Sequence, residues 1–97
     1  MSTPVWTWGG KYFGYIDGQS LWTRDGRHVG RISGVEIYNP AGKYIGEVKN
    51  KSRLITATNK KGMDGPSFTP LSRRSVVSGL DRGSYGLNDG YEDFPVL

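Results

Sequence analysis

The chain has 97 residues with 15 glycines, 5 prolines, no cysteine and a formal net charge of +4, which fits one small domain. Without cysteine there is no disulfide and no cysteine-based metal site, and no apolar run reaches the roughly 18 residues that a membrane span needs. The first residues lack the basic start and the apolar stretch of a signal peptide, so we expect a cytoplasmic protein without a membrane partner.

A repeat of sixteen residues organises the first two-thirds of the chain. Its units open on Gly14, Gly30 and Gly46, and an aliphatic residue follows each of these glycines two positions later. Half a unit more lies upstream, where Trp6-Thr7 matches Trp22-Thr23. Units of this kind must pack against one another to bury an apolar face, so we expect them to form one array.

Two turn signals in each unit, about eight residues apart, divide the repeat into short strands. Asp25-Gly26 and Pro40-Ala41-Gly42 mark one kind of turn, and Asp17-Gly18 and Ser33-Gly34 mark the other. Between the turns lie short runs of β-branched and aromatic residues, and no stretch has helical periodicity. The sequence therefore predicts an all-β fold of consecutive short hairpins over residues 6–61.

The glycine that opens each unit lies inside a predicted strand, where glycine is unfavourable unless the geometry requires it. A β-bulge at this position would let flanking residues such as Ile45 and Val48 face the same core. Alternatively, the strands converge there and leave room only for a hydrogen atom. Three or four such glycines near an axis would suit a closed, pseudo-symmetric assembly, and we expect Gly14, Gly30 and Gly46 to occupy equivalent, crowded positions.

Three segments resemble units of the four-fold β-flower family of small bacterial proteins, namely Tyr15–Gly18, Leu21–Gly30 and Ile37–Gly46. The resemblance covers residues 6–61 and implies consecutive hairpins around a pseudo-four-fold axis. The family has no assigned activity, so the resemblance bears on the fold and not on a mechanism. Because the repeat fades after Thr56, we expect the fourth unit to come from the N-terminal half-unit, the tail or both.

The composition changes after residue 61. Residues 1–61 hold ten basic and four acidic residues, a net charge of +6, whereas residues 62–97 hold three basic and five acidic ones, a net charge of −2. We therefore divide the chain into a β-hairpin repeat domain, residues 1–61, and a glycine-rich linker with a docked C-terminal arm, residues 62–97. The arm should have little regular structure beyond one added strand.

Two rings near the end of the arm are its expected anchors. We expect Tyr91 or Phe94 to be buried against the β body, because exposing both rings would invite aggregation. Glu92 or Asp93 should lie near a basic residue of the body, with Lys60, Lys61 and Arg53 as the candidates.

The sequence contains no recognisable catalytic constellation. His28 is the one histidine, and it takes the position of Tyr12 and Tyr44 in neighbouring units, so we expect a half-exposed strand side chain. Four aspartates precede glycines and fit turns better than acid–base pairs. We therefore expect no catalytic residue, no metal site and no cofactor.

Aromatic and basic residues interleave in the first half of the chain, a pattern that suits stacking on nucleic-acid bases, stacking on sugars or gripping a protein strand. Trp6, Trp22 and Tyr38 are equivalent in the repeat, and we interpret them as core residues between units. Trp8 has no aromatic counterpart, so we expect it at the surface. The candidate binding surface is Trp8, Lys11, Arg24, Arg27, Arg31 and Lys43.

Three functions are compatible with this pattern. A non-enzymatic interaction module that binds protein, as a homo-oligomer or with another partner, fits the short strands and the extended arm best. A nucleic-acid-binding module would use the basic body and its aromatic rings, and its affinity would fall steeply with salt. A small enzyme is the third alternative, which the missing nucleophile–base pair disfavours.

Overall fold

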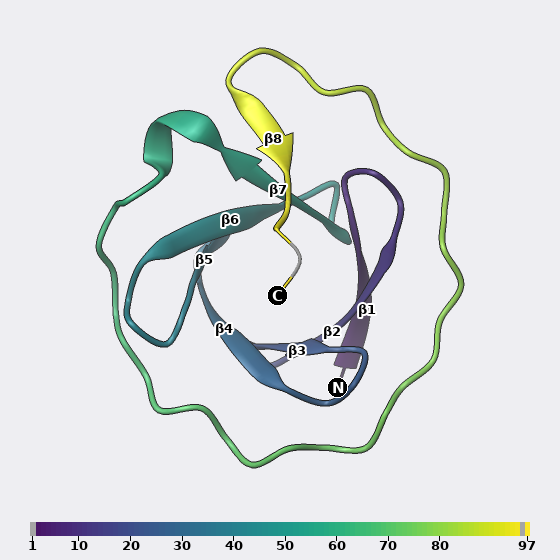
Figure 1. Cartoon of the computed structure of the whole chain (residues 1–97), viewed down its shortest axis with the longest axis vertical. Helices are drawn as coiled ribbons and strands as arrows, with labels where there is room; N and C mark the ends of the chain where they lie inside the picture. The colour runs from purple at the N-terminus through teal and green to yellow at the C-terminus, as the bar shows by residue number, and fades with distance from the viewer. Residues whose placement is uncertain (1, 96) are drawn as a thin grey trace.

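The computed structural model describes residues 2–95 and residue 97, and it places eight strands in one sheet whose neighbours follow the order of the chain (Figure 1). One short 3₁₀ helix, η1 (Thr58–Lys60), follows the seventh strand. The strands are β1 (Ser2–Thr7), β2 (Tyr12–Asp17), β3 (Ser20–Thr23), β4 (His28–Ser33), β5 (Glu36–Tyr38), β6 (Tyr44–Lys49), β7 (Arg53–Ala57) and β8 (Tyr91–Asp93).

The first seven strands close into a barrel. Consecutive strands pair in antiparallel fashion, and β1 pairs with β7 in parallel through Trp6–Arg53 and Thr7–Leu54. Closure removes the free edges that would otherwise template aggregation. The predicted all-β, closed arrangement of consecutive hairpins is therefore confirmed.

Each second strand of a hairpin carries a β-bulge at its repeat glycine. On β2, Val5 lies opposite Gly14 but Trp6 lies opposite Tyr12, so Phe13 is the extra residue. The same shift recurs on β4 and on β6, where Val29 and Ile45 are the extra residues. The bulge brings residues three positions apart to the same face of the strand. As predicted, Ile45 and Val48 both pack against the central core.

Neighbouring atoms leave no room for a side chain at the glycines of the bulges. A Cβ atom on Gly14 would lie 2.0 Å from the backbone oxygen of Trp22, and one on Gly30 would lie 2.8 Å from Ile37. One on Gly46 would lie 2.5 Å from the ring of Phe94. The predicted equivalent and crowded positions are therefore confirmed.

Three turns at one end of the barrel share one construction, and we call them tip 1 (residues 8–10), tip 2 (residues 24–26) and tip 3 (residues 40–42). In each, the side-chain oxygen of the residue before the tip accepts a hydrogen bond from the backbone N–H of the residue after it. The residues that follow the tips are all basic, namely Lys11, Arg27 and Lys43. The repeat therefore places one cation at each tip around the end of the barrel.

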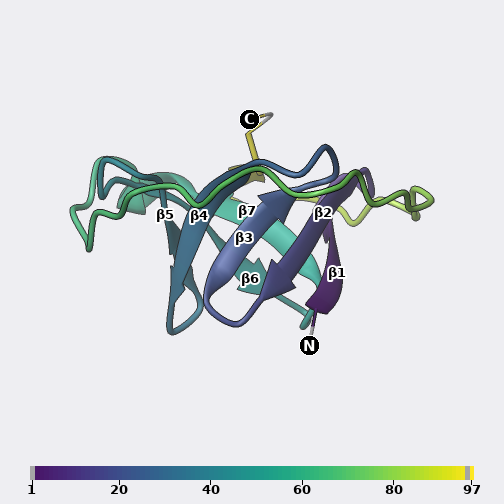
Figure 2. The same ribbon diagram turned by 90° about the horizontal axis from the view of Figure 1, so that it is seen from below.

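Residues 62–90 encircle the barrel outside the three tips, and we call this segment the belt (Figures 1 and 2). Figure 2 shows the belt at the end of the barrel where the C-terminal residues lie, away from the N-terminal ones. Each tip ends on a glycine. The backbone carbonyl of this glycine and that of the residue two positions earlier each accept a hydrogen bond from a backbone N–H of the belt. The pairs are Arg82–Gly10 and Tyr85–Trp8, Arg74–Gly26 and Val77–Arg24, and Gly65–Gly42 and Phe68–Pro40.

The belt also covers the aromatic residue that each unit places outside the core. The guanidinium carbon of Arg82 lies 3.6 Å from the ring centroid of Trp6, and that of Arg74 lies 4.0 Å from that of Trp22. Gly65 packs flat on the ring of Tyr38. These three rings are buried as predicted, but between the strands and the belt rather than in the barrel core.

Candidate functional site

The fourth unit is completed by the start and the end of the chain together. β1 pairs with the first two residues of β7, and β8 pairs with the next three, Ile55–Ala57, on the same side. The Oδ2 atom of Asp93 accepts a hydrogen bond from the backbone N–H of Gly9 at 3.2 Å, which ties β8 to tip 1. The prediction that the N-terminal half-unit, the tail or both would supply this unit is confirmed, and both do.

The chain after β8 crosses the end of the barrel, so that its last residues lie over the centre of the strands (Figure 1). Phe94 is 4% exposed and joins the central core, where its ring stands nearly perpendicular to that of Phe13 at 5.2 Å. Tyr91 is half-buried and accepts a hydrogen bond from Lys49 Nζ at 2.9 Å. The prediction that Tyr91 or Phe94 would be buried against the β body is confirmed for Phe94, on the chain itself.

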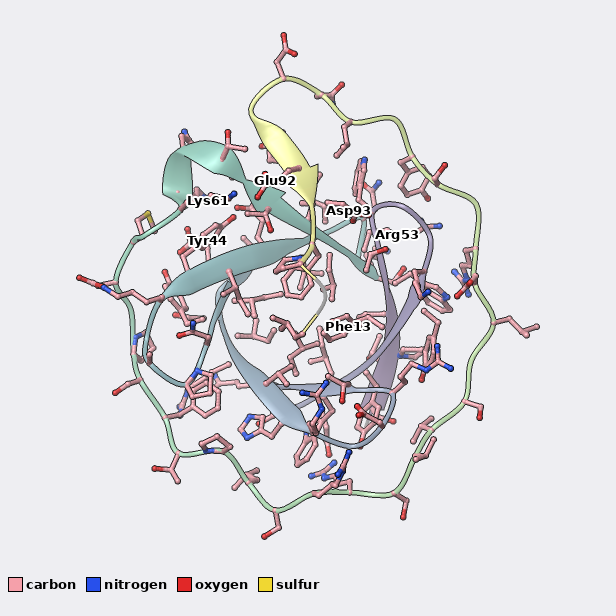
Figure 3. All side chains as sticks on the ribbon, viewed as in Figure 1. Phe13, Tyr44, Arg53, Lys61, Glu92 and Asp93 are labelled. Atoms are coloured by element: carbon pink, nitrogen blue, oxygen red, sulfur yellow. The ribbon has the colours of Figure 1, made fainter. Side chains whose placement is uncertain are left out.

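The acidic pair on β8 also meets a predicted partner. Glu92 forms an ion pair with Lys61, and Figure 3 shows these two side chains side by side and Phe13 inside the ring of strands. Arg53 instead donates to the backbone oxygen of Gly83 at 2.8 Å, so it fastens the belt. Lys60 bridges Glu36 and Glu47 at 3.0 and 3.1 Å.

A pocket of about 300 Å³ opens beside the crossing segment, between tip 1 and tip 2, and we call it the mouth pocket. Phe13, Pro95 and Leu97 give it an apolar lining. Tyr12 also borders the pocket, but its ring packs against Trp6 and Gly79 on the side of the belt. Thr7, Thr23, Lys11, Arg24, Asp25 and Arg27 complete the lining. The pocket therefore combines apolar surface with an excess of positive charge, which suits a ligand with an apolar part and an anionic part.

The cations of the mouth pocket differ in how they are already engaged. Arg27 lies 3.2 Å from Asp25 and donates to the backbone oxygen of Leu97 at 2.6 Å. A hydrogen bond from the Thr23 hydroxyl, together with the charge of Arg27, holds the pKa of Asp25 below its usual value. Within the described residues, Lys11 and Arg24 are exposed and pair with no acidic side chain. These two cations are the free charges of the site.

The structure therefore assembles half of the candidate binding surface. Lys11, Arg24 and Arg27 meet at the mouth pocket. Lys43 lies at tip 3, where it pairs with Asp64 of the belt. Arg31 lies on β4 and faces Gln19 at 3.5 Å. The apolar lining escaped the sequence analysis, because it becomes a pocket only where residues 95 and 97 cross the barrel.

The expected surface position of Trp8 is wrong. Its side chain is 8% exposed, and its Nε1 atom donates to the backbone oxygen of Gly86 at 2.9 Å. The ring centroid of Tyr85 lies 4.9 Å away. The end of the belt covers Trp8, so a residue without a counterpart in the repeat packs against a segment outside the repeat.

The expected half-exposure of His28 is also wrong, since its side chain is 9% exposed. Its Nδ1 atom accepts a hydrogen bond from Leu71 of the belt at 2.9 Å, which leaves Nε2 to donate to the backbone oxygen of Gly30 at 3.1 Å. The ring lies between Trp22 at 5.0 Å and Phe68 at 4.6 Å. Burial, with Arg74 and Arg31 nearby, lowers the pKa of His28. Both nitrogens are engaged, Nδ1 with the belt and Nε2 with β4.

The described residues contain neither a metal-binding cluster nor a membrane-spanning helix. No group of three or more histidine, aspartate or glutamate side chains is arranged to hold a metal ion in this part of the chain. Among the same residues, no helix has the length and apolar character to cross a membrane.

Comparison with known proteins identifies the architecture. The family model described as 4-fold beta flower protein matches residues 2–84. This range includes the belt up to the residue before Tyr85, so it extends past residue 61. No curated protein and no solved structure matches the chain.

Proposed function

We propose that the chain, which belongs to the 4-fold beta flower family, is a non-enzymatic protein-binding module that takes an extended peptide segment at the mouth pocket. The observation that carries the proposal is the joining of an apolar lining, formed by Phe13, Pro95 and Leu97, to two cations without acidic partners, Lys11 and Arg24. A bacterial and cytoplasmic setting belongs to the same proposal.

The two parts of the pocket have separate tasks in such a complex. Rings and aliphatic groups that fill a concave apolar site supply most of the binding free energy of a peptide. Cations at the rim add less affinity, but they orient the ligand and speed its association with an acidic partner. A peptide fits better than a compact small molecule because the segment that already lines the pocket, residues 95 and 97, follows a strand that is added to β7.

Nucleic acid remains the alternative ligand, since cations at the three tips could contact phosphates. The stacking platform that this alternative needs is weakened, because the belt covers Trp6, Trp8 and Trp22. The small-enzyme alternative gains no support from His28, because both of its ring nitrogens are engaged.

The test is selection from a random displayed-peptide library on the immobilised full chain, followed by affinity measurements on the enriched peptides. We expect enriched peptides to combine acidic with apolar residues. They should bind the double variant Lys11→Ala/Arg24→Ala at least about tenfold more weakly, a loss of about 1.4 kcal/mol. The control variant Arg31→Ala/Lys51→Ala removes the same charge from exposed residues that do not line the pocket and should bind normally.

Oligonucleotide binding separates the alternatives. Single-stranded and duplex DNA are titrated against the chain over a range of salt concentrations. For a nucleic-acid module, the mouth variant should lower the magnitude of the logarithmic salt slope by about 1.4 on a single strand. Enriched peptides that bind both double variants equally well, or no enrichment at all, would contradict the proposal.

A further inference from the structure

The end of the chain occupies the barrel mouth in the way that a bound peptide would. Residues Tyr91–Asp93 add a strand to β7, Phe94 inserts its ring into the core, and residues 95 and 97 line the mouth pocket. We propose that this segment occupies a site that binds a segment of another protein. That partner segment has an acidic pair, an aromatic residue, a proline and a further acidic residue, in that order. The inference rests on the proposed function and names the chemistry of its partner.

The strand pairing is local and can open without releasing the belt. β8 has three residues, and among the described residues it is the only strand that pairs with Ile55–Ala57 on that side, because the pairing of β1 ends at Leu54. The belt is already fixed to tip 1 by the backbone hydrogen bond of Tyr85. Residues 86–89, which lie between Tyr85 and β8, are exposed. Opening at this hinge would leave an unpaired edge on β7, which an incoming extended segment could pair with.

The core position of Phe94 specifies an aromatic ring. The ring meets Phe13 edge to face at 5.2 Å, an arrangement that aromatic pairs favour beyond the burial of their surface. On the other side, the backbone at Gly46 leaves no room for a Cβ atom, since one would lie 2.5 Å from the Phe94 ring. Glycine at this position therefore makes space for a flat ring, and an aliphatic side chain would lose the edge-to-face contact.

The acidic pair before the ring is specified by two separate donors. Glu92 forms an ion pair with Lys61, which directly follows η1. Asp93 accepts a hydrogen bond from the backbone N–H of Gly9. The position after the proline is where the chain's own segment fits poorly. The side chains of Pro95 and Leu97 are uncharged and the oxygen of Leu97 accepts from Arg27, so the segment offers no side-chain carboxylate to Lys11 and Arg24. A partner with an acidic residue there would satisfy the free charges and bind better than the chain's own segment.

A second copy of this chain is the less suitable donor of the segment. Exchange between copies would place two barrel mouths face to face. The cations at their tips, including Lys11, Arg24 and Lys43, would then approach one another, and like charges brought together at an interface oppose association. A different, acidic protein avoids this repulsion.

The experiment uses the full chain, the variant Phe94→Ala and fluorescently labelled synthetic peptides of sequence YEDFPVL, YEDAPVL and YEDFPEE. The wild-type chain holds its own segment at a high effective concentration, so it should bind YEDFPVL weakly. Phe94→Ala should bind this peptide at least tenfold more tightly and should not bind YEDAPVL. YEDFPEE should bind more tightly than YEDFPVL, and Lys11→Ala/Arg24→Ala in the same background should remove that difference.

A second variant guards against a folding defect, because Phe94→Ala removes a core ring. Glu92→Lys leaves the core intact and turns the ion pair with Lys61 into a repulsion, so it should also increase the affinity for YEDFPVL. Absence of any gain in both folded variants would overturn the inference. If library peptides of other composition bind at the mouth pocket while this series does not, the inference fails and the proposed function stands.

Two further outcomes also decide the question. If neither the library nor this series binds, the inference and the proposed function both fail. If the mass of Glu92→Lys in solution doubles and the peptides do not restore the monomer, the segment is exchanged between copies, and the inference of a different partner is overturned.

Discussion

The ring of Phe94 lies 5.2 Å from the ring of Phe13 at an interplanar angle of 87°, so the end of the chain completes a core that the first hairpin begins. Both rings belong to the same buried cluster as Val5, Leu21 and Leu54. The C-terminal segment is therefore part of the barrel and contributes directly to its stability.

We expect Phe94→Ala to lower the free energy of unfolding by about 3–5 kcal/mol, because it removes a buried ring and leaves a cavity against Phe13 and Gly46. Chemical denaturation with an unchanged m-value checks this. Leu87→Ala is the control, since Leu87 is 53% exposed and should change the stability by less than about 0.5 kcal/mol. Equal effects of the two substitutions would show that the segment does not pack in the core.

The crowding at the bulges makes a second prediction. Gly14→Ala should cost more than about 2 kcal/mol, because its Cβ atom would approach the backbone oxygen of Trp22, which cannot move without disturbing β3. Gly83→Ala is the matched control, because a Cβ atom there would meet nothing within 4 Å. Thermal and urea denaturation of both variants test the comparison, and a neutral Gly14→Ala would contradict the bulge geometry.

The lowered pKa of His28 predicts a dependence of stability on pH. In the folded state the neutral ring accepts from Leu71, so protonation breaks this hydrogen bond and places a charge in a buried site near Arg74 and Arg31. The unfolded chain, with a pKa near 6.5, then binds more protons than the folded one. The contribution of the neutral His28 ring to the free energy of unfolding is fully present above pH 6.5. It is lost as the pH falls through the lower pKa of the folded state.

Unfolding measured between pH 5 and pH 8 checks this sign. His28→Gln does not titrate, so its stability should decline less than that of the wild-type chain across the acidic part of this range. Hydrogen exchange at the amide of Leu71 should accelerate on acidification in the wild-type chain. A wild-type stability that rises as the pH falls below 6.5 would show that the charged form is favoured by the fold.

The ion pairs of Lys60 and Lys61 should differ in how much they contribute to the stability of the fold. Lys60 contacts Glu36 and Glu47, and the Glu47 side chain is 9% exposed, so its charge is poorly solvated. Lys61 and Glu92 are both about half exposed, and such pairs contribute roughly 0–1 kcal/mol. Double-mutant cycles should therefore give a larger coupling energy for Lys60–Glu47 than for Lys61–Glu92. The reverse order would contradict the structure.

The barrel could be predicted from the sequence because the residues that determine it lie close together in the chain and recur at a fixed spacing. Gly14, Gly30 and Gly46 mark the same bulge at a fixed spacing, and turn residues identify the hairpins. The path of the belt could not be predicted, because it binds the tips through backbone N–H groups. Such bonds constrain side chains little, and Gly65 makes at tip 3 the same backbone contact that Arg74 and Arg82 make at tips 2 and 1.

The same distinction explains the outcome at the candidate site. Lys11 and Arg27 could be assigned together because the repeat makes them equivalent, and both do line the mouth pocket. The burial of Trp8 could not be predicted, because the residue that covers it, Tyr85, belongs to a segment outside the repeat. The pocket itself depends on Pro95 crossing the barrel, a contact that no local pattern encodes.

The belt meets the tips in the reverse of the order in which the chain forms them. It reaches tip 3 first through Gly65, then tip 2 through Arg74, and tip 1 last through Arg82 and Tyr85. During synthesis the first hairpin therefore waits for residues 80–86 before Trp6 and Trp8 are covered. A product that stops before these residues would expose both rings and present an adhesive surface, so translation through residue 86 should be needed for the protein to remain monodisperse.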